Sequence, residues 1–270
     1  MTDDTKLRLG GMALRNGLLV HGPTHWAAAV RTDSGEIKAA SGVKPRLRGV
    51  DNVPGVRGVA RLGEAMVVIP LVKRGLPEAR LPFQDASVIA MATGASIAGS
   101  QLRKRAHGVG GEAAAGMIGI LPALLALRGG ELAAYHGVEH KAIAAYEQDA
   151  DDARESAKEH DRCGSHLVAP MLASNVAGTM VLKQVLKNPD GTSPHPGALA
   201  GGAVALASTA VAVEVFGWCE RHSDSRLARA IRRPGFEIQR VVGTREPDER
   251  QLEVGRAALA EILRAEGVGA

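Results

Sequence analysis

Four long stretches with almost no charge constrain the fold of this 270-residue chain more than any other feature. They are residues 84–102, 113–127, 167–186 and 197–219, and their only charged side chains are Asp85, Lys183 and Glu214. Apolar stretches of this kind either cross a bilayer or form the core of a helical protein. Many of their residues are alanine and glycine, which contribute little to insertion, and the mean hydropathy is −0.02. We expect membrane insertion, with an alanine-rich soluble helical bundle as the alternative.

The distribution of basic residues favours four transmembrane helices with both termini in the cytosol. In that topology the N-terminal region, residues 128–166 and the Arg-rich tail from residue 220 are cytosolic, as the positive-inside rule prefers. The outer loop 187–196 agrees because it carries only Lys187, whereas the basic run 103–105 disagrees because it also falls outside. Residues 84–127 are therefore either a full double crossing or a shallow re-entrant hairpin.

The N-terminal region is predicted to contain β-structure. Residues 7–25 carry four glycines and a proline, which favour short strands and tight turns. Residues 26–31 and 36–40 read as a hairpin around the turn at residues 32–35. Residues 56–74 predict a helix on the surface, because their apolar run is too short to span a bilayer.

The C-terminal region is predicted to end in an amphipathic helix. Pro247, followed by two acidic residues, is typical of a helix start, and leucine and isoleucine residues at 252, 259, 262 and 263 form an apolar stripe. The predicted fold is an α-rich membrane protein with some β-structure (α+β) and about four transmembrane helices. Its three regions are residues 1–60 with the hairpin, 61–222 with the membrane helices and a cytosolic loop at 128–166, and 223–270 with this helix.

A metal site is predicted in the loop between the second and third apolar stretches. His136, Glu139 and His140 form the pattern H-x-x-E-H, the inverted form of a zinc-protease motif. On a helix the two histidines share a face, and the glutamate lies beside it, where it can take a proton from an attacking water. Gly137 lowers helix stability within this motif and leaves open that a helix starts there. Four of the nine histidines and one of the two cysteines fall within residues 136–166.

The ligand set remains open at this point. The candidates for a third ligand to a divalent metal, with zinc preferred, are Glu147, His160, Cys163 and Glu214. Lys141 and Arg162 are candidates to stabilise a developing oxyanion. The predicted function is a membrane-bound, zinc-type hydrolase at the cytosolic face. The alternatives are a non-enzymatic assembly or adaptor protein with a structural His/Cys cluster and, on the strength of Glu214 in an apolar stretch, a transporter.

Motifs along nearly the whole chain resemble the YqhQ-like family of bacterial membrane proteins, which are described as predicted metal-dependent enzymes. The resemblance is carried by Gly10–Gly17 with Gly22-Pro23, Tyr135–Lys141 with Tyr146-Glu147, His160-Asp161-Arg162-Cys163-Gly164, Glu214, His222, Pro234-Gly235 and Thr244–Asp248. It implies an integral membrane protein with the histidine-rich loop in the cytosol. Met12 and Asn16 replace the usual Gln and Glu, and His166 replaces an aromatic residue, so the resemblance assigns none of these three to the site.

The expected partners follow from composition and location. The net charge of +4 suits an anionic membrane surface, and we expect contact with membrane lipid and with an unidentified substrate. No basic patch interleaved with aromatic residues accompanies this charge, so no nucleic-acid partner is expected. The N-terminal six residues lack the apolar segment of a signal peptide.

Overall fold

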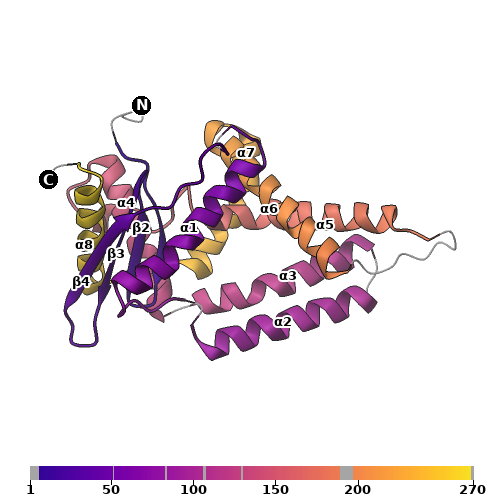
Figure 1. Ribbon diagram of the computed structural model, residues 1–270, viewed down its shortest axis with the longest axis horizontal. Coiled ribbons are helices and arrows are strands. Elements are labelled where there is room, and N and C mark those ends of the chain that lie inside the picture. Colours follow the sequence, from indigo (N-terminus) through magenta and orange to yellow (C-terminus); the bar gives the residue numbers. More distant parts are fainter. Residues whose placement is uncertain are drawn as a thin grey trace.

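A computed structural model describes residues 6–50, 52–82, 84–105, 108–128, 130–188 and 197–268. Figure 1 shows a small β-sheet with helices packed on it at one end of the molecule, and a set of long helices that extends away from the sheet. The helix-rich architecture with a small N-terminal antiparallel sheet confirms the predicted α+β class.

The sheet contains four antiparallel strands in sequence order: β1 (Gly10–Leu14), β2 (Gly17–His21), β3 (His25–Arg31) and β4 (Ile37–Val43). Turns of a few residues join neighbouring strands, so consecutive strands are also neighbours in space. The short strands predicted within residues 7–25 and the hairpin predicted over residues 26–40 are therefore confirmed. β1 and β4 are the edge strands, and β1 lies on the side of the long helices (Figure 1).

Both faces of the sheet are covered, as expected for strands with few polar residues. α4 (Gly130–Gln148) and α8 (Glu249–Ala265) pack on one face, where Leu18, Val20 and Ala29 are buried. α1 (Val56–Gly75) packs on the other face, where Leu19 and Val30 are buried. Successive side chains of a strand point to opposite faces, which explains how adjacent residues of β2 enter two different cores.

The C-terminal amphipathic helix is confirmed and begins with a capping box. The side chain of Asp248 accepts from the backbone N–H of Gln251 at 2.8 Å, and the Gln251 side chain accepts from the backbone N–H of Asp248 at 2.9 Å. Leu252 and Ile262 are buried against the sheet. α8 thereby closes the core that the first three strands begin.

The long helices are α2 (Ala86–Arg105), α3 (Gly108–Leu127), α5 (Val168–Val185) and α6 (Ala198–Arg221), followed by the shorter α7 (Arg226–Ile238). In the described residues, three helical segments are long and apolar enough to cross a membrane: 108–127, 164–185 and 199–221. Only 22%, 11% and 11% of their apolar windows are buried within the protein. Their apolar side chains therefore face outward, as they do in a protein surrounded by lipid.

Composition supports three of the four predicted crossings. Residues 84–102 form most of α2, but α2 is not among the three segments apolar enough to span, because serine, threonine, glutamine and glycine interrupt its apolar residues. The described structure therefore contains three helices apolar enough to span a membrane, and α2 packs beside α3 as a less apolar helix of the same length. Most of the predicted outer loop 187–196 lies outside the described residues.

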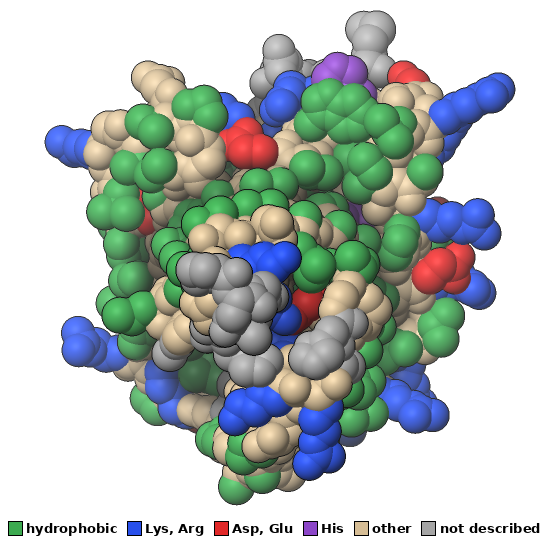
Figure 2. Space-filling model, turned by 90° about the vertical axis from the view of Figure 1, so that its right-hand side faces the viewer, with side chains coloured by type: hydrophobic (Ala, Val, Ile, Leu, Met, Phe, Trp, Pro, Cys, Tyr) green, Lys and Arg blue, Asp and Glu red, His purple; other side chains and the backbone are tan. Residues whose placement is uncertain are grey.

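A buried ion-pair group joins three of these helices. Glu112 of α3 accepts from Arg103 of α2 at 3.0 Å and from Lys183 of α5 at 2.6 Å, and its side chain is only 1% exposed. We call Arg103, Glu112 and Lys183 the Arg–Glu–Lys group. It lies towards the free end of the helices, and Figure 2 shows acidic and basic side chains at the centre of a largely hydrophobic surface there.

Candidate metal centre

α4 carries the H-x-x-E-H motif as one continuous helix. His136 and His140 lie one turn apart, and their ring centroids are 4.4 Å from each other. Gly137 does not start the helix; it lies in its interior, against the backbone of residue 245. A Cβ atom at Gly137 would be 2.3 Å from the carbonyl oxygen of Arg245, so a glycine is needed for this close approach. Its absent side chain explains why a poor helix former occupies the centre of the motif.

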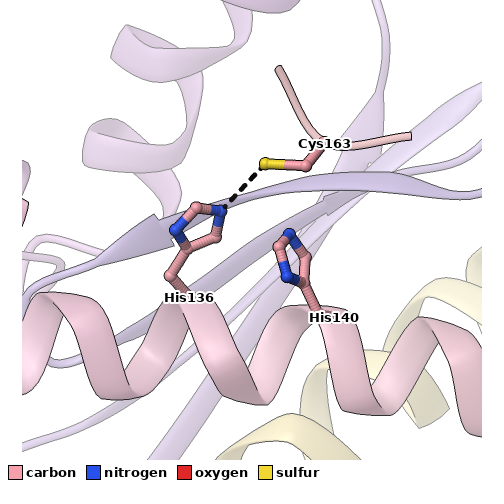
Figure 3. A group of neighbouring side chains, drawn as sticks. All are labelled: His136, His140 and Cys163. Carbon is pink, nitrogen blue, oxygen red and sulfur yellow. Dashed lines mark hydrogen bonds between the residues drawn. The ribbon is translucent and has the colours of Figure 1, made fainter. Parts of the chain in front are cut away.

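Cys163 completes a group of three potential ligands. After α4 the chain passes through the short turn η1 (Ala153–Glu155) and returns across the helix to η2 (Gly164–Leu167), with Cys163 as the residue before η2. Ligand atoms of His136, His140 and Cys163 all lie within 4.8 Å of one another. Two zinc–ligand bonds of about 2.0–2.3 Å at a tetrahedral angle hold their ligand atoms about 3.3–3.8 Å apart, so a small inward movement of these side chains would allow them to share one ion. Figure 3 shows the two imidazoles and the thiol pointing towards a common centre.

Backbone carbonyls orient both imidazoles. Nδ1 of His136 lies 2.8 Å from the carbonyl oxygen of Gly243, and Nδ1 of His140 lies 2.6 Å from that of Lys158. Because a carbonyl oxygen only accepts, each Nδ1 carries the proton and each Nε2 presents its lone pair to the centre. This is the arrangement in which metal-binding histidines are normally held.

The Nε2 atom of His140 distinguishes this site from an ordinary buried histidine pair. It is buried and has no hydrogen-bond partner in the described part of the chain. His136 Nε2, in contrast, contacts Cys163 Sγ at 3.4 Å. A buried nitrogen left without a partner costs about 1–3 kcal/mol, and a bound cation would remove that cost. Burial also lowers the pKa of His140, which favours the neutral, ligating form of the imidazole.

Glu139 lies beside the three potential ligands, between α4 and β1. A Cβ atom at Gly11 would lie 2.8 Å from Glu139 Cγ, so this glycine of β1 makes room for the acidic side chain. Burial raises the pKa of Glu139, and the neighbouring His136 and His160 offset this only in part. A carboxyl group with a raised pKa next to a cation site is suited to exchanging protons.

A cavity of about 260 Å³ opens at this group. His136, Glu139 and Cys163 form part of its wall. The remaining wall is formed mostly by β1, the end of α3 and the start of η2, through Gly11, Met12, Ala13, Pro82, Ala123, Ala126, Leu127, Leu132, Gly164 and Ser165. Two of the potential ligands, His136 and Cys163, are therefore reachable by a small molecule or a chain segment through this largely apolar space.

Three other candidates form a network next to the group. Glu147 pairs with Arg162 and lies 3.4 Å from His160 Nε2, and Arg162 also donates to the carbonyl oxygen of Leu9 at 3.2 Å. Burial raises the pKa of Glu147, but the contacts with His160 and Arg162 together outweigh it, so that the pKa is lowered overall. The His160 ring lies 5.7 Å from the His140 ring. Glu147 and His160 are therefore occupied with each other and with Arg162, and the compact group of three does not include them.

The remaining candidates lie in other surroundings. Lys141 is buried and donates to the carbonyl oxygens of Arg154 at 3.0 Å and Ser156 at 2.7 Å, with Glu246 at 2.7 Å. Glu214 of α6 is paired with Arg57 at 2.6 Å. Lys141 thus fastens the loop that follows α4, while Glu214 fastens α1 to α6.

Sequence reasoning missed the groups that hold the site in shape. The carbonyl oxygens of Lys158 and Gly243 carry no side-chain signal, and Gly243 lies in the turn η3 (Gln239–Gly243), far along the chain. Gln239 is fully buried; it accepts from the backbone N–H of His160 at 2.8 Å and donates to the carbonyl oxygen of the same residue at 3.2 Å. The one available signal was the motif Thr244–Asp248, which follows η3 directly.

Comparison with known proteins identifies a family of unknown function. The model of a family described as a protein of unknown function (DUF1385) matches residues 131–265, which is half of the chain and includes α4, the returning loop and α8. No curated protein and no solved structure matches the chain. The chain belongs to the DUF1385 family.

Proposed function

We propose that this protein is a membrane-bound, metal-dependent hydrolase whose ion is held by His136, His140 and Cys163. The observation that carries the proposal is the buried Nε2 of His140, which lacks a partner in the described residues and faces two further ligand atoms. The similarity to the YqhQ-like family, with its predicted metal-dependent enzymes, supports the same conclusion. Two imidazoles and a thiolate suit zinc among the common divalent metals.

The ligand number favours catalysis over a purely structural ion. Structural zinc sites usually have four protein ligands, whereas catalytic sites have three and leave one position for water or substrate. A zinc ion held here would activate water and polarise a carbonyl group. The cavity beside His136 and Cys163 gives substrate access to that open position.

Glu139 is the residue we assign as general base. Its carboxyl group lines the same cavity as His136, so it can take a proton from the attacking water and return it to the leaving group. Lys141 and Arg162 were expected to stabilise an oxyanion. We assign them a positioning role instead, because their side chains are engaged with loop carbonyls and with Glu147, respectively.

The membrane location is part of the proposal. We propose that α3, α5 and α6 cross the cytoplasmic membrane and that α2 crosses beside α3, so that the sheet and the metal centre both lie on the cytosolic side. The outward-facing apolar surfaces of these helices and the Arg-rich α7 directly after α6 support this orientation.

The first test is the metal content of detergent-purified protein, measured by elemental mass spectrometry. We expect about one zinc per wild-type chain, none in the His136→Ala/His140→Ala double variant, and an unchanged amount in His160→Ala. With cobalt in place of zinc, a thiolate-to-metal charge-transfer band should appear in wild type and vanish in Cys163→Ala. Folded, zinc-supplemented wild type without bound metal would overturn the proposal.

A second test asks whether the ion has an open position. Acetohydroxamate, a small metal-chelating inhibitor, should change the visible spectrum of the cobalt protein if a position is free. Glu139→Gln should keep the metal and this spectral response. An inert spectrum in a fully loaded protein would show that the ion has four protein ligands and a structural role.

A further inference from the structure

The edge strand β1 borders the cavity of the metal centre. β1 pairs only with β2 in the four-stranded sheet, so one of its two edges is free of strand pairing. Three consecutive residues of β1, Gly11 to Ala13, line the same cavity as His136, Glu139 and Cys163. The free edge of the sheet and the three potential ligands therefore share one space.

The strand register determines which backbone groups of β1 point away from the sheet. The amide of Gly22 donates to His25, and that of Arg31 donates to Asn16, so even-numbered residues of β2 bond to β3. Its odd-numbered residues then bond to β1, where their partners are Gly10, Met12 and Leu14. The N–H and C=O groups of Gly11 and Ala13 consequently point outward from the sheet.

Contacts at both ends of β1 agree with this assignment. The carbonyl oxygen of Leu9 accepts from Arg162, and the amide of Arg15 donates to the carbonyl oxygen of Arg80, so both flanking odd positions bond to groups outside the sheet. Between them, the outward groups of Gly11 and Ala13 have no partner among the described residues. Ala13 is only 7% exposed and Gly11 is partly buried, so the outward groups of β1 have limited access to water.

We propose that the substrate is an extended polypeptide segment with apolar side chains, which adds to β1 as a further strand and presents a peptide bond to the metal centre. This inference rests on the proposed hydrolase function. Strand addition to an exposed sheet edge is a general mode of peptide recognition, in which the main chain supplies affinity. An acyl chain has no groups that could pair with the N–H and C=O groups of β1.

The cavity accounts for both the position of cleavage and the side-chain preference. Gly11 packs directly on Glu139, so a peptide bond paired near Gly11 lies beside the base. Water adds to the carbonyl carbon, the C–N bond breaks, and the proton taken by Glu139 passes to the leaving amine. Ala123, Ala126 and Leu127 form the apolar wall, and they belong to the last turns of the span-capable α3. A substrate segment next to the membrane surface fits this wall.

The test compares two hydroxamates on the cobalt-loaded protein in detergent, one attached to an apolar tripeptide and one to an acyl chain. Titration of the visible spectrum gives the affinity of each without any turnover. We expect the peptide hydroxamate to bind at least about tenfold more tightly, since two or more main-chain hydrogen bonds are added. Equal or tighter binding of the acyl hydroxamate would overturn the proposal and indicate a lipid substrate.

A matched pair of proline variants tests the role of the edge. Ala13→Pro removes an outward N–H of β1, and proline is tolerated at such edge positions. Ala39→Pro is the control, because by the same register Ala39 faces outward on β4, the opposite edge strand. We expect Ala13→Pro to lose about tenfold in affinity for the peptide hydroxamate, and Ala39→Pro to change little.

A second variant covers the case in which Ala13→Pro does not fold. Ala126→Phe places a larger side chain in the apolar wall, narrows the cavity and should also weaken binding of the peptide hydroxamate. Met117→Phe, at an exposed position of α3, should leave that binding unchanged. Unchanged peptide affinity in folded Ala13→Pro and in Ala126→Phe would overturn the proposal. Wild-type protein that binds no metal would instead refute the proposed hydrolase function, so the failure of one proposal can be distinguished from the failure of the other.

Discussion

Two buried polar groups lie near opposite ends of α3 and differ in whether the protein alone satisfies them. In the Arg–Glu–Lys group, each carboxylate oxygen of Glu112 has its own cationic partner. In the metal centre, His140 Nε2 has no partner in the described residues, although two further ligand atoms face it. The first group is complete as it stands and holds helices together. The second leaves a buried nitrogen without a partner, and this difference is why we propose that it binds an ion.

The largest expected effect comes from breaking the complete group. Glu112→Ala leaves two cations near each other without an anion and should lower the free energy of unfolding by about 3–5 kcal/mol. The metal content should stay unchanged. Thermal unfolding in detergent, with metal analysis of the same samples, checks both points.

The double variant Glu112→Leu/Lys183→Met serves as the control for this prediction. Replacing a buried ion pair by apolar residues costs far less than removing one partner, so the double variant should be more stable than Glu112→Ala. A loss of metal in Glu112→Ala without a loss of stability would contradict the structural role of this group.

The second prediction concerns the incomplete group. Zinc at 100 times its dissociation constant should raise the unfolding free energy of wild type by about 2.7 kcal/mol and leave His140→Leu unaffected. Without zinc, His140→Leu should be no less stable than wild type, because it removes the unpartnered nitrogen. Unfolding curves with zinc and with a chelator measure both differences. A strongly destabilised apo variant would show that His140 is a structural residue.

A substitution at Gly137 tests how the backbone carbonyl that orients His136 contributes to metal affinity. In Gly137→Ala the new Cβ displaces the backbone around Arg245, and with it the Gly243 carbonyl that orients His136. Loss of such an orienting contact weakens metal binding by about 10–100-fold. A chelator competition assay measures the change. Gly119→Ala in α3, where nothing lies within 4 Å, should leave the affinity unaltered.

The smallest expected effect comes from another unsatisfied side-chain nitrogen, on His21 of β2. Its Nδ1 is buried without a partner in the described residues, but no other potential ligand is grouped with it there. Burial is the main cause that lowers the pKa of His21, to about 4. We therefore expect His21 to make the stability of the protein depend on pH rather than to bind metal.

The sign of the pH effect follows from the lowered pKa. As the pH falls, His21 of the unfolded chain takes up a proton near pH 6.5, whereas His21 of the folded protein does so only near pH 4. The contribution of His21 to stability is therefore fully present above pH 6.5 and is lost as the pH falls towards 4. Between pH 7 and pH 5.5 the loss should be about 1 kcal/mol. Comparing wild type with His21→Leu by unfolding at several pH values isolates this contribution, and parallel curves would contradict it.

The sequence predicted those features that depend on local spacing. The i, i+4 histidines of α4, the N-terminal hairpin and the start of α8 each depend on neighbouring residues, and the structure contains all three. Cys163 was one of four candidates for a third ligand, and only the return of the loop across α4 places it next to His136.

The features that could not be predicted depend on backbone groups and on long-range contacts. The carbonyl oxygens at Lys158 and Gly243 and the outward edge of β1 have no side-chain pattern to reveal them. Glu147 carries a carboxylate, a common metal ligand, on the same helical stripe as the two histidines. It is instead paired with Arg162 and His160, and this pairing depends on tertiary structure. The crossing predicted at residues 84–102 rested on the absence of charge, and α2 is less apolar than the three helices that are apolar enough to span.

The coverage of the sheet by α8 has a consequence for biosynthesis. The first three strands leave the ribosome about 200 residues before α8, which covers their apolar face. At a synthesis rate of about 5–20 residues per second, that face remains uncovered for on the order of 10–40 s before α8 is made. The carbonyl of Gly243 that orients His136 is also translated late, after all three span-capable helices. Metal loading should therefore follow completion and release of the chain, and nascent chains should depend on chaperones or the membrane surface until then.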